Sequence, residues 1–224
     1  ISPDGTHVAY VSNQEGQYKI WIHTEGERRK NRIYKKGHKL EQINDYSFPV
    51  LAWHPSSEIL GFVTEEEGLL KIHFYNLETG EITTRNLLYF EKILYMSFSP
   101  DATKLVLSAV VDGQTDIWVF DIASSTNERI TSDLADDYHP RFINNMRGIS
   151  FVSNRRLDTL FMENDPENNT TTAFSVFVYD YAQKDPVLQK ISEGNYINHL
   201  QPRSMEKNEF IYLSDKNGIV NRYY

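Results

Sequence analysis

The feature that most constrains this chain is an internal repeat. Three stretches align without a gap, and in each a proline is followed 13 residues later by a glycine and 5 residues after that by Trp or His. The three series are Pro3, Gly16 and Trp21; Pro55, Gly68 and His73; and Pro100, Gly113 and Trp118. A fixed period is typical of folds in which each repeat is one supersecondary unit. The chain is therefore expected to be an array of similar units.

Two further copies are less regular. The fourth keeps Ile149–Asn154 and Ser175–Asp180 but has about 15 extra residues between its halves, and the fifth keeps Phe210–Asp215, Gly218 and Tyr223. Within every unit, short alternating apolar runs are separated by turn residues such as Pro-Asp-Gly and Asp-Gly, which predicts strands in antiparallel hairpins. No segment has the capped 3.6-residue period of a helix.

The most regular units each contain four predicted strands. These lie at residues 50–53, 60–64, 71–76 and 82–85 in the second unit, and at 94–98, 104–108, 116–121 and 128–131 in the third. Four-stranded units of about 45 residues predict an all-β fold, a β-propeller of four-stranded antiparallel blades. About five blades are represented, with the first and last incomplete. Their expected limits are about 1–45, 46–90, 91–134, 135–193 and 194–224.

The ends of the chain shape a further expectation. Ile1 stands at the turn between the first and second strands of a unit, and the chain stops after the third strand of the last one. We therefore expect a segment of a longer protein whose ring has six or more blades; the alternative is that the two incomplete ends pair and close a smaller ring. No run approaches the roughly 18 apolar residues of a membrane span, so no direct membrane insertion is expected in this segment.

The repeat resembles the blades of TolB-like propellers, whose motif runs Trp-Ser-Pro-Asp-Gly, a strand, Ser-Asn, Gly, then Ile-Trp/Tyr-Val-Asp. The matching residues are Ile1–Gly5 with Val8–Asn13, and Phe98–Asp101 with Asp116–Asp121. Asn144–Met146 and Met205–Lys207 depart from the motif where Pro-Asp-Gly would stand. The resemblance implies a bacterial envelope protein, located in the periplasm or cell envelope. Similar blades also occur in the propellers of prolyl-oligopeptidase and dipeptidyl-peptidase enzymes.

The residues themselves offer little catalytic chemistry. The chain has no cysteine, no Gly-x-Ser-x-Gly elbow and no phosphate-binding glycine loop, and its seven histidines lack metal-ligand spacing. Paired carboxylates occur at Asp112 with Asp116 and at Asp136 with Asp137, and both pairs are interpreted as structural, with cation binding or acid–base chemistry as the alternative. Trp21, Trp53 and Trp118 are expected to pack between blades rather than to stack on sugars. We therefore predict no catalytic residue, no metal site and no cofactor.

A basic insertion is the first strong departure from the repeat length. About 10 extra residues separate Trp21 from the expected fourth strand near Ile43, and the insertion is predicted to connect the third and fourth strands of the first blade. Its bases are Arg28, Arg29, Lys30, Arg32, Lys35, Lys36 and Lys39, with no acid among them. It is predicted to dock an acidic protein or anionic polymer, and the competing interpretation is a solvated hairpin whose charges protect an exposed edge from aggregation.

An acidic insertion is the second departure, between the second and third strands of the fourth blade. Its carboxylates are Asp158, Glu163, Asp165 and Glu167. Leu157, Leu160, Phe161 and Met162 near its start predict a base that folds onto the blade, below a polar tip that contacts a partner.

These observations lead to a prediction of a non-catalytic protein–protein interaction scaffold. Protein partners are expected and nucleic acid is not, because the net charge is −8 and the basic stretch has too few aromatics to stack bases. The alternative is the substrate-gating propeller of a prolyl-oligopeptidase-like or dipeptidyl-peptidase-like serine peptidase, with its hydrolase domain outside this segment.

Overall fold

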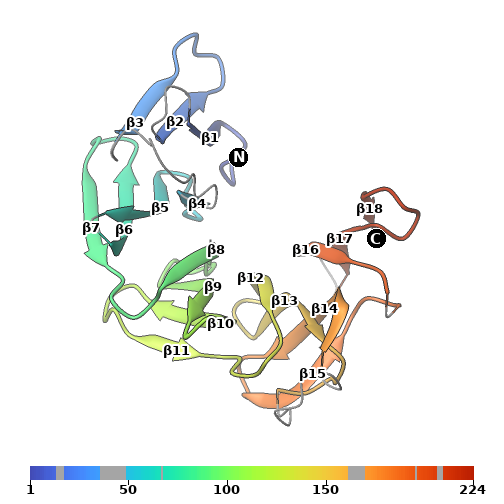
Figure 1. The fold of residues 1–224 in the computed structure, drawn as a ribbon. Coiled ribbons are helices and arrows are strands. Elements are labelled where there is room, and N and C mark those ends of the chain that lie inside the picture. Colours follow the sequence, from blue (N-terminus) through green and yellow to red (C-terminus); the bar gives the residue numbers. More distant parts are fainter. Residues whose placement is uncertain (14–17, 36–48, 67, 161–169, 195, 206–208) are drawn as a thin grey trace. The chain divides into compact units, whose positions relative to one another are not determined.

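The computed structural model is all-β. It describes residues 1–13, 18–35, 49–66, 68–160, 170–194, 196–205 and 209–224, and these contain five antiparallel sheets (Figure 1). The described residues include no helix of the length and apolar character that crossing a membrane requires. The chain divides into two compact units, Ile1–Ile93 and Leu94–Tyr224.

The first unit holds two sheets whose strand order follows the chain. One has three strands and the other has four. Their bounds are β1 His7–Ser12, β2 Lys19–Thr24 and β3 Asn31–Lys35 in the first sheet, and β4 Val50–Trp53, β5 Ile59–Glu66, β6 Leu69–Asn76 and β7 Ile82–Asn86 in the second.

The second unit holds three sheets built in the same way, with β8 beginning just before its boundary. The first contains β8 Lys92–Phe98, β9 Lys104–Val111, β10 Gln114–Asp121 and β11 Asn127–Arg129. The second contains β12 Asp137–Ile143, β13 Gly148–Arg155, β14 Thr170–Asp180 and β15 Asp185–Lys190. The third contains β16 His199–Ser204, β17 Phe210–Ser214 and β18 Asn221–Tyr223.

The predicted propeller class is confirmed, with five blades of three or four antiparallel strands in the described part of the chain. All four strands predicted for the second blade are present. In the third blade the last strand ends at Arg129, so Ile130 and Thr131 lie outside it. Thr131 instead turns its hydroxyl inward and accepts the backbone N–H of Ile117 at 2.9 Å.

The repeated turn has a chemical cause. In the third blade, the Ser99 hydroxyl donates to the Asp101 carboxylate at 2.6 Å, and the backbone N–H of Thr103 donates to the same group at 3.1 Å. The third turn position is left-handed, with φ of 60° at Ala102 and 80° at Gly5. Glycine adopts this conformation without strain, whereas alanine adopts it only because the surrounding hydrogen bonds require it.

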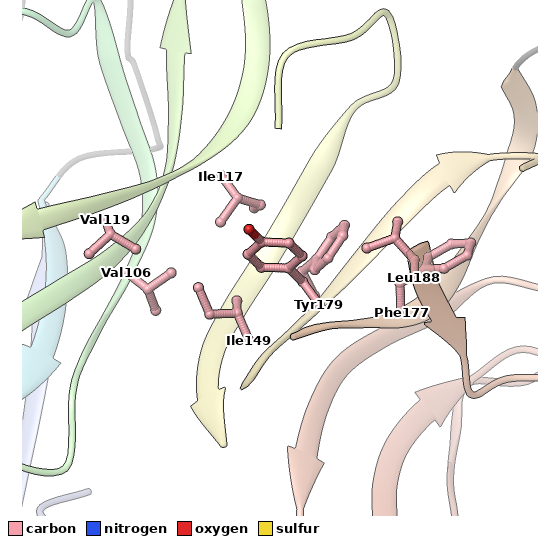
Figure 2. Packing of buried hydrophobic residues seen from close by; sticks show 8 residues of the cluster. Val106, Ile117, Val119, Ile149, Phe177, Tyr179 and Leu188 are labelled. Carbon is pink, nitrogen blue, oxygen red and sulfur yellow. The ribbon is translucent and has the colours of Figure 1, made fainter. Parts of the chain in front are cut away.

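The core of the second unit lies between neighbouring blades. Val106, Ile117 and Val119 of β9 and β10 form one cluster with residues of β13, β14 and β15. Figure 2 shows these side chains between the two sheets. Trp118 is 3% exposed, and the guanidinium carbon of Arg129 lies 5.4 Å from its ring centroid. Its predicted burial is confirmed.

Replacing Trp118 tests how much this buried packing contributes to stability. We expect Trp118→Ala to lower the free energy of unfolding by about 3–5 kcal/mol, because a large aromatic side chain leaves a cavity. Urea denaturation followed by circular dichroism measures the change. Val187→Ala is the control, since Val187 is 63% exposed and should change stability by less than about 0.5 kcal/mol. Equal costs for the two variants would contradict the packing role of Trp118.

Candidate functional site

The basic stretch lies only partly where it was predicted. Arg28, Arg29 and Lys30 occupy the predicted connection, between β2 and β3, but Arg32 and Lys35 belong to β3 itself. Lys36 and Lys39 lie outside the described residues. The prediction that Arg32 and Lys35 precede the blade's last strand was wrong, because β3 already begins at Asn31.

A β-bulge explains why this charged segment forms a strand. Ile20 pairs with Tyr34 and Trp21 pairs with Arg32, so Ile33 is the extra residue on β3. The bulge lets Ile33 and Tyr34 both pack against the core of this unit while Arg32 stays exposed. Strict alternation would have sent one of the two apolar residues into solvent.

Tyr34 fixes the strand to the neighbouring blade. Its hydroxyl donates to the carboxylate of Glu66 at the end of β5, and its ring meets Phe62 edge-on with 5.0 Å between centroids. Burial and the adjacent Glu66 carboxylate raise the pKa of Tyr34 above its usual value, so the phenol stays protonated as a donor. The basic strand is therefore held on a rigid support.

The described bases of this segment carry uncompensated positive charge. All five are exposed, and among the residues that the structure describes none has a carboxylate within ion-pair distance. Among the described residues, Lys30 makes a cation–π contact, with its ammonium 5.3 Å from the centroid of the Tyr10 ring. We define these five residues, Arg28, Arg29, Lys30, Arg32 and Lys35, as the basic edge.

The acidic connection is described only at its base. It joins β13 to β14 as predicted, and Phe161, Met162, Glu163, Asp165 and Glu167 lie outside the described residues. Asp158 is exposed, and its carbonyl accepts the backbone N–H of Leu188 at 2.9 Å. Leu160 packs against the core cluster, which confirms the folded base, but Leu157 is 46% exposed and does not contribute to it.

The first paired carboxylate has a structural partner. Asp116 is fully buried in β10, and Arg129 donates to it at 2.6 Å while the Thr131 hydroxyl donates at 3.2 Å. Burial raises the pKa of Asp116 to about 6, although the Arg129 guanidinium acts in the opposite direction. Asp112 forms the β9–β10 turn with Gly113, where both residues have positive φ. The hairpin interpretation of this pair agrees with the geometry.

The second carboxylate pair leads to a buried ion network that the sequence analysis missed. Arg155, whose side chain has 0% exposure, donates to Asp137 at 2.9 Å and lies 3.1 Å from Asp133. It also donates to the Thr159 carbonyl at 3.1 Å. Burial disfavours the charge on Arg155, but Asp137 and Asp133 outweigh that effect and raise its pKa. The sequence analysis could not find this network, because β12 and nearly all of β13 separate the two aspartates from Arg155, and no spacing rule predicts an ion pair across such a separation.

The histidines of the described part of the chain do not gather with carboxylates into a metal site. His73 is buried with its two ring nitrogens at 2.8 Å from the hydroxyls of Thr64 and Thr84. The described residues contain no group of three His, Asp or Glu side chains able to hold a metal ion.

A second group of arginines lies on the first strands of the blades. Arg141 on β12 donates to the Tyr95 hydroxyl on β8, and Arg203 occupies the corresponding position on β16. The only sequence signal for them was the Pro-Arg dipeptide at 140–141 and 202–203.

Comparison with known proteins supports the propeller fold. No protein-family model matches the chain. The Tol-Pal system protein TolB of Wolinella succinogenes is 37% identical over 82 residues, which is 36% of this chain and 19% of that protein. The chain thus matches less than a fifth of this relative's length.

Solved structures resemble the chain over nearly its whole length at low identity. TolB from Acinetobacter baumannii has a TM-score of 0.61 and 16% identity, covering 97% of this chain and 52% of that one. Prolyl oligopeptidase B from Galerina marginata has a TM-score of 0.63 and 14% identity, covering 100% of this chain and 32% of that one. These similarities show a shared fold.

Removing the buried guanidinium tests the ion network. We expect Arg155→Met to lower the free energy of unfolding by about 3–5 kcal/mol, because Asp133 and Asp137 then remain buried without a counter-charge. Arg156→Met, at the exposed neighbouring position, should cost less than about 1 kcal/mol. Adding Asp133→Asn and Asp137→Asn to Arg155→Met should recover most of the loss. If these additions only deepen the loss, the charge explanation is wrong.

Asp116 gives a pH-dependent prediction. Its pKa is 3.8 in an ordinary setting and about 6 in the folded protein, so between these values the folded protein holds a proton that the unfolded chain has lost. This group's contribution to the free energy of unfolding therefore falls as the pH rises through that window, by at most about 1.4 kcal/mol per pH unit. The Asp116→Asn variant should lack this component. Urea unfolding of both proteins from pH 4 to pH 7 measures it, and parallel curves would contradict the raised pKa.

Proposed function

We propose that this chain is a non-catalytic protein-interaction scaffold of TolB-like propeller type, acting in the periplasm or cell envelope of a bacterium. The partial similarity to the Tol-Pal system protein TolB and the likeness to solved TolB structures support this proposal. The residues that would contact partners are those of the basic edge, and Lys36, Lys39, Asp158, Glu163, Asp165 and Glu167 are proposed as further contacts.

The observation that carries the proposal is the basic edge. Five cations lie within eight residues, three in the β2–β3 connection and two on β3, which Tyr34 ties to the next blade; among the described residues none has a carboxylate within ion-pair distance. The chain as a whole carries a net charge of −8, so this positive segment stands against a negative background. Segregated charge of this kind steers an oppositely charged partner and fixes its orientation.

An acidic protein surface is the partner that fits this chemistry. Three of the bases lie in the β2–β3 connection and two on β3, and their guanidinium and ammonium groups can donate to carboxylates on a protein surface. Nucleic acid would also need aromatic platforms. The described bases are accompanied by two tyrosines: Tyr34, whose ring meets Phe62 edge-on, and Tyr10, which lies beside Lys30.

A second candidate is the substrate-gating propeller of a serine peptidase. It is favoured by the likeness to prolyl oligopeptidase B and to the dipeptidyl peptidase 4 of Porphyromonas gingivalis, which has a TM-score of 0.57. The full-length protein distinguishes the two candidates. Labelling by a fluorophosphonate probe, lost on substitution of a serine in a Gly-x-Ser-x-Gly motif, would support the peptidase and contradict the scaffold.

Neutralising the basic edge should slow partner association. We expect the variant with Arg28, Arg29, Lys30 and Arg32 replaced by Ser to bind a captured envelope partner more slowly and with a flatter dependence on salt. Exposed charges act over about 8–10 Å at physiological ionic strength, and steering is lost when they are removed. Co-purification from native envelopes with mass spectrometry identifies the partner, and surface plasmon resonance across a salt titration measures the rates.

A matched control separates local docking from net charge. The variant with Arg147, Arg156, Lys216 and Arg222 replaced by Ser removes the same number of exposed charges from the other unit. Both variants should unfold near the wild-type urea midpoint, since each exposed charge contributes at most about 1 kcal/mol. Equal slowing in both variants would overturn the assignment of docking to the basic edge.

A further inference from the structure

Two arginines and a tyrosine lie on the first strands of the three blades in the second unit. Tyr95 comes from β8, Arg141 from β12 and Arg203 from β16, and these strands lie along the same edge of the unit (Figure 1). Strands β12 and β16 pack against each other. Residues far apart in the sequence therefore lie on neighbouring strands.

Arg141 and Tyr95 hold each other in place. A guanidinium N–H of Arg141 donates to the Tyr95 hydroxyl, and the guanidinium carbon lies 5.6 Å from the centroid of the same ring. The ring of His139 meets Tyr95 edge-on with 5.3 Å between centroids. Because the tyrosine oxygen accepts from Arg141, its own O–H is still available to donate to a further group.

The two arginines lack a counter-charge. Burial lowers the pKa of Arg141, and the neighbouring Arg203 lowers it further. Among the described residues no carboxylate lies within ion-pair distance of either guanidinium. Arg141 is partly buried and Arg203 is exposed. Their like charges repel each other, and an anion placed between them relieves that repulsion.

The backbone is strained at the same two places. His139 and Gln201 have φ of 53° and 50°, and each precedes a proline, where a left-handed conformation is unusual. Each sits in a bulge, between Tyr138 and Arg141 on β12 and between Leu200 and Arg203 on β16. Bulges redirect the side chains that follow them, and such strain is often retained at binding sites.

A buried ring nitrogen of His139, next to Tyr95, also lacks a hydrogen-bond partner among the described residues. This atom, Nδ1, is inaccessible to solvent. Burial and the charge of Arg141 lower the pKa of His139, so its ring stays neutral at neutral pH. The site thus contains two guanidiniums, one hydroxyl donor and flanking aromatic rings.

We propose that Arg141, Arg203 and the Tyr95 hydroxyl form a binding site for the carboxylate of an organic acid or acidic peptide. Guanidiniums bind planar carboxylates through paired hydrogen bonds, and the ring of Tyr95 offers an apolar surface to the carbon chain that carries the carboxylate. The site lies in the second unit and the basic edge in the first, so either assignment can fail without the other.

Titration with small acids tests the site directly. The full chain, labelled with ¹³C and ¹⁵N at arginine, is titrated with sodium glutarate at constant ionic strength, with glutaramide as the neutral analogue and inorganic phosphate as a second anion. We expect saturable shifts of the Arg141 and Arg203 side-chain signals with glutarate and none with glutaramide. Arg203→Gln should weaken glutarate binding about tenfold or more, because a charge-assisted hydrogen bond is lost.

Arg203 is exposed, so its replacement leaves the fold intact, and Arg222→Gln on β18 is the matched control that should bind as wild type. A blocked tetraglutamate peptide that binds more tightly than glutarate would identify a peptide as the source of the carboxylate, and weaker binding would identify a free acid; both results support the site. Unchanged glutarate affinity in Arg203→Gln, or tighter binding of phosphate than of glutarate, would overturn it.

Discussion

The buried guanidinium of Arg155 is the interaction on which the second unit depends. It lies between Asp137, the first residue of β12, and Asp133 in the connection that leads there from β11. It also holds the Thr159 carbonyl, where the chain leaves β13. This buried guanidinium therefore holds the β11–β12 connection and the base of the acidic connection in place. Ser108 adds a contact from the preceding blade, because its hydroxyl donates to the Asp137 carbonyl at 2.6 Å.

Cations in this protein fall into two groups by their counter-charges. Arg155 and Arg129 meet carboxylates at 3.1 Å or less, and they supply counter-charge to the buried Asp133, Asp137 and Asp116. The basic edge, Arg141 and Arg203 have no such partner among the described residues. Charge that is excluded from solvent is usually compensated, as Arg155 is. The basic edge is exposed and needs no counter-ion for stability, and it is the segregation of its charge from the acidic rest of the chain that favours recognition. The fold supplies the rigidity, and the unpaired bases supply the chemistry.

The sheets could be predicted because their signals are local. Proline, aspartate and glycine at fixed positions set the turns, and alternating apolar residues set the strands. The position of the basic strand could not be predicted, since the bulge at Ile33 breaks alternation and only tertiary packing of Tyr34 on Phe62 decides it. The contact between Arg141 and Tyr95 joins different blades, and no spacing within one repeat encodes it.

Strand order within each sheet equals order along the chain, and this has a consequence for how the protein forms. Every pairing partner is the next segment to be synthesised, so a hairpin closes only a short loop and pays a small entropic cost. Within a blade, successive strands can therefore pair early, whereas the core cluster of β9, β10, β13, β14 and β15 forms only when two neighbouring blades are both present. The Asp133–Arg155 pair likewise needs β13 to be in place before the preceding connection is fixed. Such local pairing favours growth by successive blades, in which each new blade completes the core of the one before it.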